Sequence, residues 1–451
     1  MNKNSYYLLS LGCPKNEVDA ECMSALLVEA GYVFAADPAQ ARFLIVNTCA
    51  FLESAVEEAI EAILQLADQK GEESYLVVAG CLAQRYKEKI CQEMPEVDAI
   101  IGTGEYGSIV SLLGELEAGQ NLRHHRPERP RDLSYLNTAR MPSAPRGTYA
   151  YLKIAEGCSN VCAFCAIPGI RGPFRSRQPD DIIREARRLT DAGVQELILV
   201  AQDTTRYGLD LPEKTSLADL LSRLTEEVPA VGLIRCLYFY AGAVTDRLIQ
   251  EMADNPKVAH YVDLPIQHAS NRILAAMRRH ETIELIGHVI ERFRKQIPDV
   301  IIRSTVITGF PGENEEDFQL LLEAVRKFRF DRLGCFVYSA EEGTVAASLP
   351  GRVEPALAEW RRGKLMEIQQ QISLESNLQR VGQVTPVLLE GVEERGILFQ
   401  GRSYGEAPEI DPVLFVAATA PHLTIGSRPQ VRIIDAKPYE LIGVSLDEYR
   451  E

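Results

Sequence analysis

Short apolar runs rich in β-branched residues alternate with segments of helical period along most of the chain. Between residues 5 and 118, four such strand–helix pairs follow one another, which indicates a parallel, doubly wound sheet. The expected strands are Tyr6–Leu11, Phe43–Val46, Tyr75–Ala79 and Ala99–Ile101, and the expected helices are Val18–Ala30, Ser54–Ala67, Ala83–Glu93 and Gly107–Glu117. We therefore expect an N-terminal domain of this kind over residues 1–120.

Residues 121–147 break the pattern, because they are rich in Pro and Arg and lack a regular period, and we interpret them as a linker. A second series of six strand–helix pairs predicts a full or partial TIM-like βα barrel over residues 148–376. Its expected strands are Tyr149–Ile154, Glu196–Ala201, Leu233–Tyr240, Tyr261–Pro265, Ile301–Thr308 and Cys335–Tyr338. Its expected helices are Ile182–Ala192, Leu217–Glu227, Asp246–Ala253, Ile283–Lys295, Glu316–Phe328 and Pro355–Leu378.

Residues 377–447 differ again, since short strands are separated by Gly, Pro and Asp turns. The expected strands Val384–Leu389, Gly396–Gln400 and Val413–Val416 predict a small antiparallel β-barrel. The expected fold class is therefore α/β, with two βα domains followed by an all-β module.

The composition is that of a globular protein, with 46% hydrophobic and 25% charged residues among 451. Every apolar run falls well short of the ~18 residues that a membrane span needs, and Tyr6–Leu11 is too short for the core of a signal peptide. We therefore expect a cytoplasmic protein. A formal charge of −16 opposes binding to a phosphate backbone and favours a basic protein partner, although it also serves solubility alone.

The most specific chemical signal is a CxxxCxxC loop, formed by Cys158, Cys162 and Cys165 directly after a predicted strand. Three thiolates in one loop can hold three corners of a cubane iron–sulfur cluster and leave the fourth iron open. A structural zinc site needs four ligands, and no fourth Cys or His lies at the spacing of a zinc finger. The spacing therefore predicts an iron–sulfur cluster, with zinc or coincidence as the alternatives.

A second set of cysteines is dispersed along the N-terminal segment. Cys13, Cys49 and Cys81 each follow one of its first three predicted strands. In a parallel sheet these positions meet at the carboxyl edge, beside helix N-termini that stabilise anionic sulfur. They predict a second cluster with three protein ligands, and the alternative is three buried structural cysteines.

These motifs resemble those of a known family. The CxxxCxxC loop, with Phe164 before its last Cys, is similar to the cluster loop of the radical S-adenosylmethionine (SAM) superfamily. The wider set resembles the methylthiotransferases of that superfamily, on Leu11-Gly12-Cys13-Pro14-Lys15-Asn16, Val46-Asn47-Thr48-Cys49, Ala79-Gly80-Cys81 and Gly309-Phe310-Pro311-Gly312-Glu313. The resemblance covers the whole chain, and the last module resembles a TRAM domain.

Three further motifs resemble the branch of this family that modifies a ribosomal protein. They are Cys13-Pro14-Lys15-Asn16, Tyr338-Ser339-Ala340-Glu341-Glu342-Gly343-Thr344 and the segment 401–411. The resemblance implies replacement of C–H by C–SCH3 at the β-carbon of an aspartate in small-subunit ribosomal protein twelve. It also implies two 4Fe–4S clusters, on Cys158, Cys162 and Cys165 and on Cys13, Cys49 and Cys81, and SAM as both radical source and methyl donor.

The resemblance implies SAM contacts near the carboxyl ends of the barrel strands, where sites of such barrels lie. The candidates are Phe164, Gln202, Gln267, Arg303, Gly309 and Tyr338. Arg303 and Gln267 are the candidates for the SAM carboxylate and ribose, and an inter-strand hydrogen bond is the alternative for each. Apart from the two clusters, we expect no catalytic side chain.

The implied partners are a basic ribosomal protein, free or on the ribosome, a reductant such as flavodoxin or ferredoxin, and a sulfur donor. From residue 380 onward there are seven basic and eleven acidic residues, a difference of −4 in the module that would contact the substrate. An RNA-binding barrel would present a basic groove, so this charge disfavours a tRNA substrate. Two alternatives stay open: a tRNA adenosine methylthiotransferase, and an iron–sulfur electron carrier that does not cleave SAM.

Overall fold

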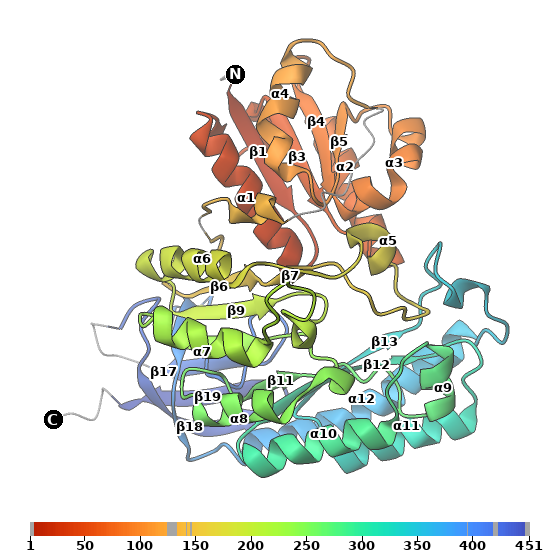
Figure 1. Cartoon of the computed structure of the whole chain (residues 1–451), viewed down its shortest axis with the longest axis vertical. Helices are drawn as coiled ribbons and strands as arrows, with labels where there is room; N and C mark the ends of the chain where they lie inside the picture. The colour runs from red at the N-terminus through yellow and green to blue at the C-terminus, as the bar shows by residue number, and fades with distance from the viewer. Residues whose placement is uncertain are drawn as a thin grey trace.

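The computed structural model describes residues 4–123, 133–140, 142–144, 147–394, 396–417 and 423–446. Figure 1 shows an N-terminal α/β unit that lies on a larger central βα unit, with a β-rich unit formed by the end of the chain. The linker predicted at residues 121–147 lies partly outside the described residues. None of the helices in the described part combines the length and apolar character that crossing a membrane requires.

The N-terminal unit is a five-stranded parallel sheet of order β2-β1-β3-β4-β5, which confirms the predicted doubly wound sheet. Its strands are β1 Ser5–Ser10, β2 Val33–Phe34, β3 Phe43–Thr48, β4 Tyr75–Gly80 and β5 Ala99–Ile101, and its helices are α1 Pro14–Glu29, α2 Glu53–Asp68, α3 Cys81–Glu93 and α4 Ile109–Glu117. Helices α1 and α4 cover one face, and α2 and α3 cover the other. All six residues of β3 are buried, as expected for a strand covered on both faces. The pattern did not predict β2, because two exposed edge residues have no period.

The central unit is an open half-barrel of six parallel strands. They form two groups, of order β10-β9-β6 and β11-β12-β13, joined by a bridge between Ile234 and Val258. No ladder closes β13 onto β6 among the described residues, so the partial form of the predicted barrel is the one observed. The strands are β6 Tyr149–Lys153, β9 Glu196–Val200, β10 Leu233–Cys236, β11 Tyr261–Asp263, β12 Ile301–Thr308 and β13 Arg332–Val337.

Amphipathic helices pack on the outer face of these strands and share one apolar core with them. They are α6 Pro179–Asp191, α7 Leu217–Glu227, α8 Asp246–Asp254, α9 Asn271–Ala276, α10 Ile283–Gln296, α11 Glu315–Phe328 and α12 Pro355–Leu378. A short antiparallel pair, β7 Ala155–Glu156 and β8 Arg175–Ser176, brackets the one-turn helix α5 Ile167–Arg171. The predicted strand Leu233–Tyr240 ends at Cys236, and Tyr238 has a left-handed backbone that a strand cannot contain.

The C-terminal unit is a curled six-stranded sheet of order β14-β18-β19-β17-β16-β15. Its strands are β14 Val384–Pro386, β15 Leu388–Val392, β16 Phe399–Arg402, β17 Val413–Ala417, β18 Gln430–Lys437 and β19 Glu440–Ser445. The backbone N–H groups of Val387 and Leu389 donate to Pro429 and Ser427 at 3.0 Å, so the sheet curls back on itself. The predicted small barrel is confirmed, but β17 and β19 pair in parallel while the other pairs are antiparallel.

The segment 401–411 packs against the amino ends of the half-barrel strands. The Arg402 guanidinium lies 2.8 Å from the carboxylate of Glu196, the first residue of β9. The hydroxyl of Tyr261, which opens β11, donates to Asp411 at 2.5 Å. This segment therefore covers the end of the half-barrel opposite to the one where βα loops carry function.

Candidate functional site

Three cysteines meet at the carboxyl edge of the N-terminal sheet, as predicted. Cys13 precedes α1, Cys49 follows β3, and Cys81 opens α3 directly after β4. A Cβ on Gly12 would lie 2.5 Å from the Cβ of Cys49. The loop before Cys13 thus approaches Cys49 too closely for any side chain, which explains the glycine at this position.

Asn16 ties these three loops together. Its amide nitrogen donates to the carbonyl of Leu11 at 3.0 Å and to that of Thr48 at 2.8 Å. Its amide oxygen lies 3.7 Å from Sγ of Cys81. One buried side chain therefore contacts the segments that carry all three cysteines. The motif analysis contained Asn16 without a role, because contacts between distant loops leave no local pattern.

The charge around the first trio favours thiolates. Burial alone would raise the pKa of the Cys13 thiol, but the cations of Lys15 and Arg171, with the N–H groups of Asn16 and Lys15, outweigh burial and lower this pKa. Burial raises the pKa of Cys81 to about 12, against the opposing charge of Arg171. A bound metal removes the proton of such a thiol outright, so burial does not prevent ligation.

The CxxxCxxC cysteines lie in the loop between β7 and α5. The N–H of Cys158 donates to the carbonyl of Gly172 at 3.0 Å, which closes the base of this loop. Burial raises the pKa of Cys158 and of Cys162, and raises that of Cys165 to about 12. The loop thus folds as a compact, half-buried unit with its three thiols close together.

Both trios have the donor set of an iron–sulfur cluster. The thiols within each trio lie close enough for their charges to interact. No three Cys, His, Asp or Glu side chains in the described part of the chain surround the position of a single metal ion. A cubane cluster does not require that arrangement, because each cysteine binds a different iron. The residues present fit two such clusters.

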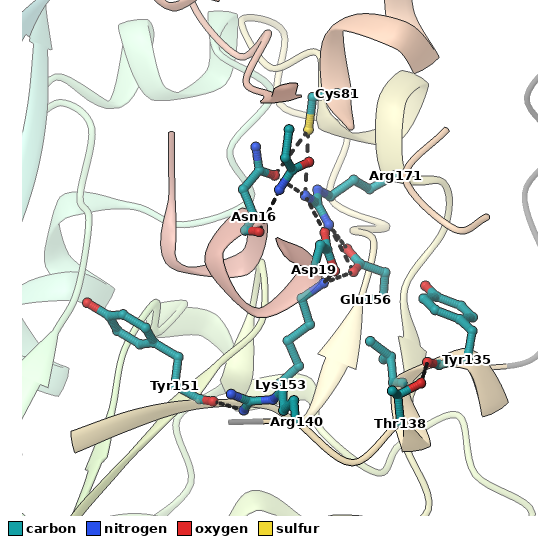
Figure 2. A network of polar contacts seen from close by, with 12 residues as sticks. Asn16, Asp19, Cys81, Tyr135, Thr138, Arg140, Tyr151, Lys153, Glu156 and Arg171 are labelled. Atoms are coloured by element: carbon teal, nitrogen blue, oxygen red, sulfur yellow. Dashed lines mark hydrogen bonds and ion pairs between the residues drawn. The ribbon is translucent and has the colours of Figure 1, made fainter. Parts of the chain in front are cut away.

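Arg171, on α5, joins the two cysteine loops. Its Nη2 donates to the amide oxygen of Asn16 at 2.5 Å and lies 3.6 Å from Sγ of Cys81. Figure 2 shows the guanidinium between these two groups and the carboxylates of Asp19 and Glu156. The last residue of the helix that follows the CxxxCxxC loop therefore contacts the first trio directly.

Lys153 completes this buried group of charges. Its Nζ donates to Glu156 at 2.9 Å and also to Asp19, and Arg171 donates to both oxygens of Glu156 at 3.0 Å. All four side chains are almost fully buried. Despite burial, Arg171 and Lys153 hold the pKa of Glu156 well below its usual value. Two cations and two carboxylates thus balance each other between the N-terminal unit and the half-barrel.

Two of the residues predicted to contact SAM share one apolar cluster. Phe164 and Tyr338 pack against the same buried group, which includes Phe310 and Ala163. The rings of Tyr338 and Phe310 meet edge to face, with centroids 5.4 Å apart. The Tyr338 hydroxyl is buried and finds no hydrogen-bond partner among the described residues. An unpaired buried hydroxyl is costly, so a ligand oxygen or nitrogen fits here.

Gly309 lies beside this cluster, and packing accounts for its residue type. Its φ is +77°, and a Cβ would lie 2.4 Å from the Cβ of Ala358 on α12. Its N–H donates to Glu313 at 2.9 Å. The glycine is therefore required for the close approach of α12, whether or not a cofactor also contacts it.

Gln202 and Gln267 lie just beyond the carboxyl ends of β9 and β11. Gln202 donates to Glu156 at 3.0 Å, while its buried carbonyl oxygen has no partner within the described part of the chain. Gln267 has a φ of +66° and holds its loop against β12 through backbone bonds with Thr305 and Ile307. The free oxygen of Gln202 again leaves one polar atom for a ligand.

Arg303 is the predicted SAM contact whose charge is already paired within the chain. It is the third residue of β12, and it donates to Asp263 at 2.7 Å and lies 3.7 Å from Asp411. Asp411 belongs to the segment that covers the amino ends of the strands. The guanidinium is thus occupied by two carboxylates.

A cavity of about 590 Å³ opens beside the CxxxCxxC loop. Cys162 and Cys165 line it on one side, α3 on the second, and the segment 342–345 on the third. The third side includes the end of the motif Tyr338–Thr344. Glu341 of this motif pairs with Arg85 of α3 at 3.0 Å. Solvent-sized molecules can thus approach this loop between the N-terminal unit and the half-barrel.

Comparison with protein families agrees with this architecture. Residues 5–102 match the uncharacterized protein family UPF0004, residues 152–325 match the radical SAM superfamily, and residues 381–445 match the TRAM domain. Among solved structures, the radical SAM methyltransferase TsrM from Kitasatospora setae, with cobalamin and a 4Fe–4S cluster bound, has a TM-score of 0.54 at 13% identity, covering 74% of this chain and 75% of its own. The cobalamin-dependent SAM radical enzyme OxsB has a TM-score of 0.52 at 12% identity, covering 82% and 56%. The class that fold and site define is thus a radical SAM enzyme.

Curated relatives narrow the class further. Proteins named ribosomal protein uS12 methylthiotransferase RimO are 44% identical in Acetivibrio thermocellus, 46% in Pelotomaculum thermopropionicum and 43% in Geobacter sulfurreducens. Each match covers at least 97% of this chain and at least 98% of the relative. The chain belongs to the RimO family of radical SAM methylthiotransferases.

Proposed function

We propose that this enzyme transfers a methylthio group to the β-carbon of an aspartate in ribosomal protein uS12. Cys158, Cys162 and Cys165 hold the 4Fe–4S cluster that serves SAM, and Cys13, Cys49 and Cys81 hold a second one. The observation that carries this proposal is the contact of Arg171, on the helix that follows the CxxxCxxC loop, with Asn16 of the first trio at 2.5 Å. Two clusters so placed can address one substrate carbon.

When bound, the clusters and SAM supply the radical that removes hydrogen from an unactivated carbon, the sulfur and the methyl group. The chain's own residues bind and orient these groups. Arg171 donates to the thiol of the ligand Cys81, and the amide oxygen of Asn16 lies close to the same sulfur. Gly12 lacks a side chain, which leaves room for the loops of Cys13 and Cys49 to meet. No side chain is required as an acid or base for hydrogen abstraction.

SAM binds, in this proposal, at the carboxyl ends of the half-barrel strands. The free carbonyl oxygen of Gln202 and the free hydroxyl of Tyr338 support this placement, and Phe164 packs beside Tyr338. Gln267 and Gly309 belong to the loops that would surround the cofactor. Arg303 is a weaker candidate than the sequence implied, because Asp263 and Asp411 already occupy its guanidinium.

The substrate is a basic protein in this proposal, and the names of the relatives support uS12. The charge of the C-terminal unit supports this less than the sequence implied. Glu406 is buried against Arg380, and Asp411 is buried beside Arg303, so neither contributes to the surface that would meet a substrate. We also propose a cytoplasmic location, a flavodoxin- or ferredoxin-like reductant and a separate sulfur donor.

We also propose three domains, although one segment of the last domain packs on the central one. Residues 1–120 form the unit of the first trio, residues 148–376 the radical SAM core and residues 377–447 the TRAM-like unit. The segment 401–411 belongs to the last unit by sequence, yet it packs on the amino ends of the core strands through contacts such as Arg402 with Glu196.

A mass measurement tests the substrate. Ribosomal protein uS12 is isolated from cells with and without this gene, and the proposal predicts a methylthio adduct only when the gene is present. Purified enzyme with both clusters is then incubated with SAM, reductant, sulfide and either unmodified uS12 or tRNA. Modification of tRNA with uS12 left unchanged would overturn the proposed substrate. Release of no deoxyadenosine would overturn the radical SAM activity itself.

A further inference from the structure

Lys15 is a buried cation of the N-terminal unit whose side chain contacts the half-barrel. It is the second residue of α1, and only 8% of it is exposed. Its Nζ lies 3.4 Å from the carbonyl oxygen of Ala201, at the carboxyl end of β9 in the half-barrel. The same nitrogen lies 3.7 Å from the centre of the Tyr238 ring, just beyond β10. The ammonium therefore sits at the mouth of the half-barrel.

No carboxylate in the described part of the chain forms an ion pair with Lys15, unlike the neighbouring cations. Lys153 and Arg171 are both paired with Asp19 and Glu156, so those four charges balance. Lys15 has one long hydrogen bond and one ring face for its three donors. A buried ammonium with unused donors is costly without an anionic partner.

The anion-forming groups that interact with the Lys15 charge are Tyr238, Cys13 and Glu156. The Glu156 carboxylate is already paired with Lys153 and Arg171. A thiolate bound to iron shares its charge with the metal, so it does not replace a carboxylate as a full counter-ion. One place for an external anion therefore remains beside the ammonium.

The position of Lys15 relates it to both cysteine trios. Only Pro14 separates it from Cys13 in the first trio. On the other side, Ala201 is followed by Gln202, which donates to Glu156 at 3.0 Å, two residues before Cys158. Lys15 thus connects the segment of the first trio with the strand end that lies beside the CxxxCxxC loop.

We propose that the Lys15 ammonium binds the side-chain carboxylate of the acceptor aspartate and so selects an acidic residue as substrate. This inference rests on the proposed function, in which the reacting atom is the β-carbon. That carbon is bonded directly to the carboxylate carbon, so an ion pair at Lys15 places the reacting C–H within one bond of a fixed point. The nearby N-terminus of α1 adds a favourable field for the same anion.

The test uses two substrates and two variants of the full enzyme with both clusters. Binding of unmodified uS12 is measured by titration calorimetry without SAM, beside uS12 in which the acceptor aspartate is replaced by asparagine. Wild-type enzyme should prefer the aspartate form. In Lys15→Met, affinity for the aspartate form should fall by about 30-fold or more, the usual effect of removing one partner of a desolvated ion pair. Affinity for the asparagine form should stay as it was.

A second variant and a spectrum separate substrate binding from support of the cluster. Lys15→Arg keeps the cation and should keep the preference for aspartate. Iron content and the electron paramagnetic resonance spectrum of the reduced clusters should match wild type in both variants. A Lys15→Met enzyme that still prefers aspartate would overturn the proposal. So would loss of affinity for both substrates together with loss of iron, which would assign Lys15 to the first trio.

Failure of this inference and failure of the proposed function give different results. If wild-type enzyme binds and modifies uS12 but the preference for aspartate does not depend on Lys15, only the role of Lys15 is wrong. If wild-type enzyme neither binds nor modifies uS12, the proposed function is wrong and the role of Lys15 with it.

Discussion

The two ends of the half-barrel strands carry charged residues in similar number but use them differently. At the amino ends, Arg402 pairs with Glu196 and Tyr261 bonds to Asp411, both partners being residues of the same chain. At the carboxyl ends, the described cysteines form no disulfide, and the Gln202 oxygen and the Tyr338 hydroxyl have no hydrogen-bond partner in the described part of the chain. The carboxyl ends therefore keep two buried polar atoms available to a ligand, beside the paired charges of Lys153 and Glu156. At the amino ends, ion pairs such as Arg402 with Glu196 hold the segment 401–411 on the strands.

The comparison also shows what a sequence motif can conceal. The segment 401–411 resembles a branch-specific feature, and its acidic residues suggested a surface for a basic substrate. In the structure, Glu406 and Asp411 face arginines of the core strands instead. The motif thus helps to hold the last unit on the core, and these two carboxylates are not available to a substrate.

The largest effect is expected at the carboxyl end, for Arg171→Met. This change leaves Asp19 and Glu156 buried with one cation instead of two. Breaking a buried ion-pair group in this way costs about 3–5 kcal/mol of stability. The midpoint of urea unfolding of the full chain measures it. Arg184→Met, which removes an exposed pair with Asp181, should leave the midpoint unchanged, and equal midpoints for the two variants would contradict the role of Arg171.

The ion pairs that hold the segment 401–411 at the amino ends of the strands should contribute less stability in acid. Despite burial, Arg380 and Arg332 and the hydroxyl of Ser403 lower the pKa of Glu406 from 4.5 to about 2. A depressed carboxyl pKa stabilises the fold above the unfolded value, and this stability is lost as pH falls from about 4.5 towards 2. It amounts to about 3 kcal/mol.

Glu406→Gln provides the matched measurement. The gap in unfolding free energy between wild type and this variant should shrink as pH falls from 5 to 3. A gap that stays constant over this range would contradict the lowered pKa. Iron content measured at neutral pH should not change, because Glu406 lies at the end remote from both cysteine trios.

Gly12→Ala tests whether close packing of the loops is needed for the first trio to hold iron. Its φ of +95° strains any other residue, and the added Cβ would collide with Cys49. We expect about 2 kcal/mol of destabilisation and loss of iron from the first trio only. Gly31→Ala is the control, since its φ of +87° is similar and nothing lies within 4 Å of its Cβ position. It should lose about 1 kcal/mol and retain all iron.

The smallest effects on stability are expected for the neighbouring residues Glu341 and Glu342, near the cavity beside the CxxxCxxC loop. Buried Glu341 accepts hydrogen bonds from Arg85 at 3.0 Å and from the N–H of Glu53 at 2.8 Å. Glu341→Gln should therefore cost about 1 kcal/mol. Glu342 is exposed and pairs with Lys89, so Glu342→Gln should give no measurable change in thermal unfolding. The reverse order would show that this motif does not hold α3 against the half-barrel.

Periodic segments could be predicted closely from the sequence. The strand Ile301–Thr308 and the helix Pro355–Leu378 agree with the structure at both ends, because Gly309 follows the strand and Pro355 opens the helix. The predicted strand Leu233–Tyr240 was too long, since the left-handed backbone of Tyr238 depends on contacts such as that with Lys15 rather than on local pattern.

Some residues of the site could likewise be predicted from the sequence, and others could not. The placement of Cys13, Cys49 and Cys81 followed from strand order, because parallel strands bring their loops to one edge. Cys158, Cys162 and Cys165 followed from their spacing within a single loop. The roles of Arg171 and Asn16 did not follow, since both depend on contacts across more than 30 residues of chain that no local spacing encodes. Arg303 shows the converse, a residue of suitable type whose partner Asp411 could be known only from the fold.

Iron counting tests the central claim most directly. The reconstituted wild-type chain should contain about eight irons, as two separate 4Fe–4S clusters. A variant with Cys13, Cys49 and Cys81 changed to Ala should keep about four and still release deoxyadenosine from SAM without modifying uS12. The matching variant at Cys158, Cys162 and Cys165 should keep about four and release none. A wild-type chain that holds only one cluster, or a first variant that still methylthiolates uS12, would contradict the account.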